Sequence, residues 1–240
     1  MAKLTKEFVE ATLELADKGQ SKISEREREL FGISSPRLKA LLNNLCSKED
    51  TKYLELGVYK GSTIISAVYG NKTCKAVGVE NYKYDEREPK RHAPEGQIWE
   101  NMKSQLKANL DRYSDPGVPV DVSNITIVEG NFQEVDLSKH GKFDICFFDI
   151  VPATTDTYVS FFEKIVPVLS SEAVILFSNY SNVHNAKELD SLLADNSDKF
   201  DIQWKTQRIS GGLSDYTQYH SGLLIVGIKK KIAKINKAAT

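Results

Sequence analysis

The chain opens with two segments in which apolar residues recur every three or four positions. The first covers residues 6–18, and the second follows a Ser-Ser-Pro sequence at positions 34–36. Such spacing after a helix-start signal is typical of amphipathic helices. We therefore expect residues 1–50 to form an N-terminal helical extension that serves as a lid over a site or as a dimer contact.

From position 51 onward, short apolar runs alternate with segments of helical spacing. Seven runs are predicted strands, at residues 53–56, 76–80, 125–128, 144–149, 173–177, 202–206 and 223–228. Strands that alternate with helices are typical of a parallel sheet covered on both faces. The last two runs have no helical pattern between them, which favours an antiparallel pair at one edge. The pattern thus predicts a Rossmann-like, doubly wound α/β domain over 51–230, with a mostly parallel seven-stranded sheet and an antiparallel C-terminal edge strand.

Composition and charge narrow the classes of function. The 240 residues are 40% hydrophobic, enough for a core that needs no disulfide or metal. The 32 basic and 33 acidic side chains nearly cancel, which argues against a nucleic-acid partner. Three widely spaced cysteines suggest free core thiols. No apolar run resembles a signal peptide or a membrane span, so we expect a cytoplasmic protein without a membrane partner, ending in a basic tail at 231–240.

The first predicted strand runs into Glu55-x-Gly57-x-x-x-Gly61, followed by Ser62 and Thr63. The glycines allow a sharp turn and a close approach of the backbone to a ligand. A carboxylate where dinucleotide sites have their first glycine would repel a pyrophosphate, but it suits an ammonium or a sulfonium. The motif therefore favours S-adenosylmethionine (SAM) over a dinucleotide. The alternative is a glycine turn that serves packing alone.

Glu80 closes the second predicted strand, about 20 residues after Gly57. An acid at this strand end can accept hydrogen bonds from both hydroxyls of a ribose. Together with the glycine turn, it strengthens the prediction of an adenosine-containing cofactor.

Four stretches, residues 53–63, 76–80, 128–133 and 143–149, resemble the class I SAM-dependent methyltransferases in order and spacing. They are most similar to the small-molecule O-methyltransferase branch. The resemblance implies that the first loop holds the methionine portion of SAM, Glu80 the ribose, and residues 131–133 the adenine. The cofactor-binding residues expected on this basis are Glu55, Gly57, Tyr59, Gly61, Ser62, Thr63, Glu80, Asn81, Asn131, Phe132, Gln133 and Asp149.

The chain departs from this pattern where a metal would bind. Catechol-type O-methyltransferases place an Asp after the fourth strand and an Asp-Asn pair after the fifth. Asp149 matches the first acid and Asn179 the final amide, but Ser178 replaces the second acid. Because Mg²⁺ binds largely through carboxylates, this loss weakens the expectation of a catalytic metal without removing Asp149 and Asn179 as candidate ligands.

Three residues are candidate general bases for methyl transfer. Asp149 ends a strand beside the expected methyl donor, His184 follows the fifth strand, and His220 precedes the last. A histidine titrates near neutral pH and suits the role. The long polar segment 81–97 is either a lid or substrate clamp or a surface insertion.

The sequence thus predicts a methyltransferase that uses SAM to methylate a small molecule, on oxygen rather than nitrogen. Alternatives are a SAM-binding module without catalysis, an NAD-dependent oxidoreductase, and an aminopropyl transferase on the same fold. A homodimer is typical of O-methyltransferases of this kind.

Overall fold

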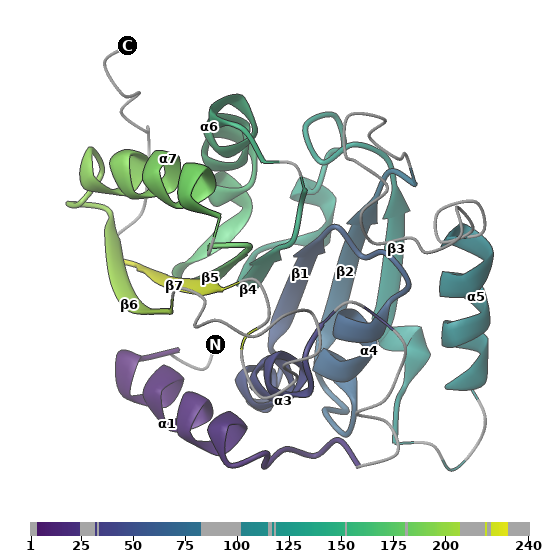
Figure 1. Ribbon diagram of the computed structural model, residues 1–240. Coiled ribbons are helices and arrows are strands. Elements are labelled where there is room, and N and C mark those ends of the chain that lie inside the picture. The colour runs from purple at the N-terminus through teal and green to yellow at the C-terminus, as the bar shows by residue number, and fades with distance from the viewer. Residues whose placement is uncertain are drawn as a thin grey trace.

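The computed structural model describes residues 4–24, 32, 34–82, 102–114, 117, 119–151, 153–180, 182–206, 219 and 222–229. Within these residues, seven strands form one sheet in the order β3-β2-β1-β4-β5-β7-β6 (Figure 1). Their bounds are β1 Lys52–Leu56, β2 Lys75–Glu80, β3 Ile125–Glu129, β4 Phe143–Phe148, β5 Leu169–Ser178, β6 Phe200–Thr206 and β7 Leu223–Ile228.

The α-helices of the described residues are α1 Lys6–Asp17, α3 Pro36–Leu45, α4 Ser62–Val68, α5 Met102–Arg112, α6 Thr155–Lys164 and α7 Val183–Ala194. Short 3₁₀ turns cover Val122–Asn124, Ser138–His140 and Val166–Val168. The two N-terminal helices begin as the sequence predicts. Thr5 caps α1 by accepting from the Phe8 N–H, and Ser35 caps α3, whose first residue is Pro36.

The predicted doubly wound sheet is confirmed. β1 pairs in parallel with both β2 and β4, so the strand order reverses between β1 and β4. β7 runs antiparallel to β5 and to β6, as expected of the C-terminal strand. It lies between these two strands, so β6 forms the outer edge. The carboxyl ends of β1, β2 and β4 meet where the order reverses, the usual place for a ligand in such sheets.

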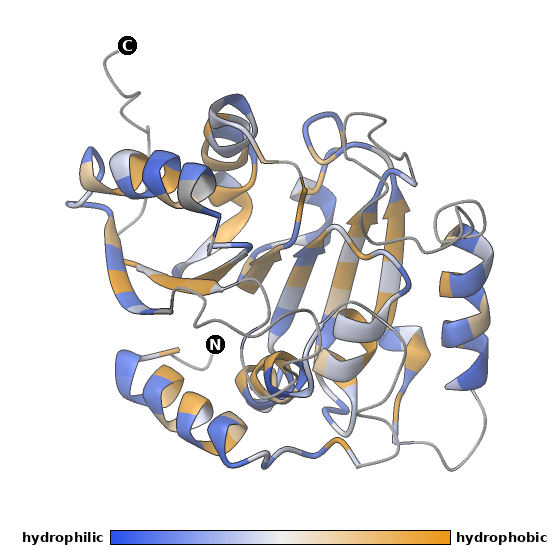
Figure 2. Cartoon of the chain, viewed as in Figure 1, coloured by the Kyte–Doolittle hydropathy of each residue, from blue (hydrophilic) through white to orange (hydrophobic). Residues whose placement is uncertain are grey.

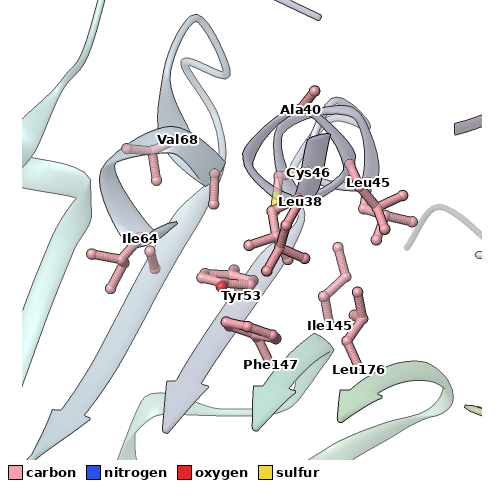
Figure 3. Close-up of a cluster of buried hydrophobic side chains, with 14 of the residues drawn as sticks. Leu38, Ala40, Leu45, Cys46, Tyr53, Ile64, Val68, Ile145, Phe147 and Leu176 are labelled. Carbon is pink, nitrogen blue, oxygen red and sulfur yellow. The ribbon is translucent and has the colours of Figure 1, made fainter. Parts of the chain in front are cut away.

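Two hydrophobic clusters cover the two faces of the sheet. One contains Tyr53, Phe147 and Leu176, against which α3 and α4 pack (Figure 3). The other is rich in aromatic residues from α6, β4 and β5, among them Phe148 and Phe161, whose rings meet edge to face at 5.2 Å. Alternation along each strand produces this division, because successive side chains point to opposite faces.

The N-terminal extension belongs to the first of these clusters. Leu13 and Ala16 of α1 and Leu41 of α3 are buried in it, and Figure 2 shows hydrophilic and hydrophobic patches alternating along α1. Asp17 accepts a hydrogen bond of 3.2 Å from the Tyr219 hydroxyl, linking α1 to the residues before β7. The role of the extension as a lid or a dimer contact stays a prediction.

Helix α7 is not among the predicted elements. Its buried residues Ala186, Leu189 and Leu193 do follow helical spacing, but the polar Ser-Asn-Tyr-Ser-Asn sequence before them reads as a loop. The predicted basic tail at 231–240 and the segment 83–97 lie outside the described residues. Cys46, Cys74 and Cys146 are buried free thiols, as predicted. No helix in the described ranges is long and apolar enough to span a membrane.

Candidate functional site

The loop from β1 to α4 turns through three residues with positive φ. These are Gly57 at +88°, Tyr59 at +53° and Gly61 at +83°. The Gly61 N–H closes the turn on the Val58 carbonyl at 2.9 Å. A Cβ on Gly57 would collide with the carbonyl oxygen of Asp149. Only glycine therefore fits where the β1 loop passes the end of β4.

Glu55 is buried beneath this loop. Its carboxylate accepts hydrogen bonds from the Tyr53 hydroxyl at 2.5 Å and the Thr63 hydroxyl at 2.6 Å. Burial raises the pKa of Glu55 from 4.5 to about 8, and the charges of Asp149 and Glu80 add to this, while the two hydroxyls oppose it. The carboxylate thus tethers α4 to β1 and carries its charge only at some cost.

Replacing Glu55 with glutamine is expected to change how stability depends on pH. The folded-state pKa of about 8 lies above the ordinary 4.5. The wild-type protein therefore loses free energy of unfolding as pH rises from 4.5 through 8, because the folded state holds a proton that the unfolded state has released. Glutamine keeps the size and an acceptor oxygen but cannot ionise.

Urea unfolding at several pH values tests this expectation. The difference in stability between Glu55→Gln and the wild type should grow in favour of the variant between pH 5 and pH 9. Parallel pH profiles for the two proteins would show that Glu55 does not titrate within this range.

Glu80 joins the loops that follow β1 and β2. One carboxylate oxygen accepts from the Tyr59 N–H at 2.8 Å, and the other from the Tyr82 N–H at 2.9 Å. Asn81, which stands between Glu80 and Tyr82 in the chain, is exposed. Glu80 therefore fixes the conformation of both loops beside the turn at Gly57.

Asp149 lies directly after β4, and its N–H bonds to the Leu56 carbonyl at 2.9 Å. Its Oδ1 accepts from the Ser178 hydroxyl and, at 3.3 Å, from the amide of Asn179. Burial raises the pKa of Asp149, the bonds from Ser178 and Asn179 oppose this, and the charge of Glu80 adds to it. Glu55, Glu80 and Asp149 thus lie close enough at the switch point for the charge of one to disfavour ionisation of another.

Residues 131–133 follow β3 and contact α6 through Ser160. The side-chain oxygen of Asn131 accepts from the backbone N–H of Gln133 at 3.0 Å, and the side-chain amide of Gln133 donates to the Ser160 hydroxyl at 2.8 Å. Phe132 is buried, with its ring 6.1 Å from that of Phe148 in an edge-to-face arrangement. Hydrogen bonds thus hold the turn, in which the buried Phe132 stands between the polar residues Asn131 and Gln133.

Solved structures of low sequence identity share this fold. Magnesium protoporphyrin IX methyltransferase from Synechocystis, solved with bound SAM, superposes with a TM-score of 0.53 over 92% of this chain and 83% of that one, at 12% identity. A candidate caffeoyl-CoA O-methyltransferase from Staphylococcus aureus gives 0.51 over 92% and 91%, at 17% identity. An rRNA methylase from Streptococcus thermophilus gives 0.51 over 79% and 93%, at 10% identity. The fold is that of the class I methyltransferases. No protein-family model matches the chain, and no curated protein is similar to it in sequence.

The donor set at the rim of this methyltransferase fold does not suit a divalent cation. Ser178 and Asn179 both turn polar hydrogens toward Asp149, and the Asn179 amide also donates to the Ser178 oxygen at 2.7 Å. A hard cation requires the opposite, oxygen lone pairs that converge on one point. Within the described residues, no group of three His, Cys, Asp or Glu is placed to hold a metal.

The remaining predicted site residues are Ser62, Thr63, His184 and His220. Ser62 and Thr63 are buried in the first turn of α4. The His184 side chain is 73% exposed and pairs with Glu188 of its own helix at 2.9 Å. Among the described residues no hydrogen bond joins His184 to Asp149 or its partners. His220 lies outside the described residues.

Two contributors to the site were not predicted. Tyr53 binds Glu55, and it stands two positions earlier on the same strand, a spacing that places both side chains on one face. Asn109 of α5 donates to the Lys60 carbonyl at 2.7 Å and so supports the glycine loop from the side. No local motif marks Asn109, because its role depends on where α5 packs.

Proposed function

We propose that this protein is a SAM-dependent methyltransferase. The observation that carries the proposal is the placement of three acidic side chains, Glu55, Glu80 and Asp149, around the glycine turn at the carboxyl ends of neighbouring strands. A ligand with positive charge favours the ionised form of such neighbouring acids. SAM carries an ammonium and a sulfonium, whereas the pyrophosphate of a dinucleotide would add negative charge. The class I methyltransferase fold supports the same conclusion.

Under this proposal, different residues of the site bind different parts of SAM. The backbone of the loop 57–62 holds the methionine portion, with the Glu55 carboxyl group beneath it, whose ionisation a bound cation would favour. Glu80 binds the ribose hydroxyls, with Asn81 beside it, and residues 131–133 lie along the adenine. The bound cofactor supplies an electrophilic methyl group.

We further propose that the acceptor is a small molecule with a hydroxyl group, and that Asp149 removes its proton. Asp149 is partly exposed beside the glycine turn, and the hydrogen bonds that its side chain accepts from the described residues end on Oδ1, so Oδ2 is the oxygen proposed to take the proton. Its raised pKa makes it a better base near neutral pH. The formal net charge of −1 does not favour a nucleic-acid acceptor. His184 and His220 remain the alternative bases.

Calorimetric titration of the purified protein with SAM, S-adenosylhomocysteine and NAD tests the proposal. We expect SAM to bind with a Kd on the order of micromolar and NAD not to bind in the same range. Preference for NAD would overturn the cofactor assignment and favour an oxidoreductase. If SAM binds, transfer of its labelled methyl group is then measured with phenols, carboxylic acids, amines and total RNA. Labelling of RNA alone would overturn the small-molecule acceptor, and binding without transfer to any class would favour a module without catalysis.

A further inference from the structure

The last residue of β5 and the first residue after β4 form a contact set by the sheet itself. The parallel register pairs Phe148 with Phe177, so Asp149 and Ser178 follow side by side. The Ser178 hydroxyl donates to Asp149 Oδ1, and Asn179, held at φ +59°, donates to both of them. Two hydrogen bonds thus hold Asp149 Oδ1, and a third, from Asn179 to Ser178, orients the two donors.

These contacts use the oxygen atom of Asp149 that a metal ion could otherwise bind. A carboxylate that ligates Mg²⁺ uses its lone pairs on the ion. Here the lone pairs of Oδ1 are used by a hydroxyl and an amide. The Asn179 amide, the other candidate ligand, presents its nitrogen rather than its oxygen to Asp149. The arrangement stabilises an anion and not a cation.

We propose that Ser178 is a positioning residue that takes the place of a metal-binding acid, so that Asp149 accepts the proton of the acceptor without a divalent cation. This inference rests on the proposed function for its chemistry. The acceptor oxygen forms the new C–O bond as the C–S bond of the donor breaks, and that bonding pair stays on sulfur. The hydroxyl proton passes to Asp149 Oδ2 while Ser178 and Asn179 hold Oδ1.

The absence of a cation site is tested with Mn²⁺ alone, by electron paramagnetic resonance of the free ion. The wild type and Ser178→Ala should show no saturable binding below about 1 mM. Ser178→Asp places a second carboxylate beside Asp149, and it should bind Mn²⁺ at least about tenfold more tightly, because two acids supply the ligands that such an ion prefers. Adding Asp149→Asn to that variant should remove the gain.

Wild-type binding of Mn²⁺ at micromolar concentration, lost in Asp149→Asn, would overturn the proposal. This titration uses neither SAM nor an acceptor, so its result is independent of whether the proposed function holds. If Ser178→Asp does not fold, the comparison of wild type with Asp149→Asn still decides the point.

The positioning role is tested by the pKa of the Asp149 carboxyl, followed by ¹³C NMR in the ligand-free protein. Hydrogen bonds to the ionised form lower the pKa of an acid. Ser178→Ala should therefore raise the pKa of Asp149, and Ser178→Thr, which keeps the hydroxyl, should restore it. A pKa equal in the wild type and in folded Ser178→Ala would show that Ser178 does not act on Asp149.

Discussion

Glu80→Ala is expected to weaken SAM binding by about tenfold to a hundredfold, the range of hydrogen bonds to a charged group. Two effects add. The variant loses the acceptor proposed for the ribose hydroxyls, and it leaves the N–H groups of Tyr59 and Tyr82 without the carboxylate that fixes both loops. Calorimetric titration of the variant with SAM measures the loss.

Glu129→Ala is the matched control. Glu129 lies opposite Glu80 in the register of β2 and β3, and its removal changes the net charge equally. Its side chain is 58% exposed and pairs with Lys103, so it takes no part in fixing the loops. This variant should bind SAM within about twofold of the wild type, because a solvent-exposed charge contributes little.

A conservative variant and a measurement of folding complete the test of Glu80. Glu80→Gln keeps one acceptor oxygen and should bind with intermediate affinity. Thermal unfolding of each variant separates a local loss from a loss of fold. SAM binding by folded Glu80→Ala at wild-type strength would show that the acid at this strand end does not hold the ribose, and it would remove a main support of the cofactor assignment.

The position of the candidate site could be predicted from the sequence because strand ends obey a simple rule. Glu55, Gly57 and Glu80 are far from Asp149 in the chain, yet parallel strands bring their carboxyl ends to one edge of the sheet. Acids and glycines at the carboxyl ends of neighbouring parallel strands are therefore expected to lie close together in space. The antiparallel strand β7 was predictable for a different reason, because no helical pattern separates the last two predicted strands.

The orientation of side chains at that edge was not predictable in the same way. The motif places Glu55 beside a ligand, but both its oxygens accept bonds from Tyr53 and Thr63, because α4 packs over this face of β1. Likewise, the sequence places Ser178 where catechol-type O-methyltransferases have an acid. That its hydroxyl donates to Asp149 depends on the register of β4 and β5, which no local pattern determines. Hydrogen bonds between distant elements are properties of the packed fold.

Gly57→Ala is expected to have the largest effect on stability among the changes considered. Alanine at φ +88° is strained by about 1 to 2 kcal/mol. Its Cβ would also collide with the carbonyl oxygen of Asp149 and lie 3.0 Å from the carbonyl carbon. Both atoms are backbone, so the loop or the end of β4 must move, at a further cost of about 1 to 3 kcal/mol. Urea unfolding measures the sum, and SAM titration of the folded fraction should show weakened binding.

Gly117→Ala separates strain from collision. Gly117 has φ +101°, and no heavy atom lies within 4 Å of an added Cβ, so this variant carries the backbone strain alone. The entropy that alanine removes from the unfolded chain is the same at both positions and cancels in the comparison. The excess destabilisation of Gly57→Ala over Gly117→Ala is thus the cost of separating the β1 loop from Asp149. If the two variants are equally destabilised, the loop yields freely at this point, and Asp149 is not held at the fixed distance from the glycine turn that direct transfer to an aligned acceptor requires.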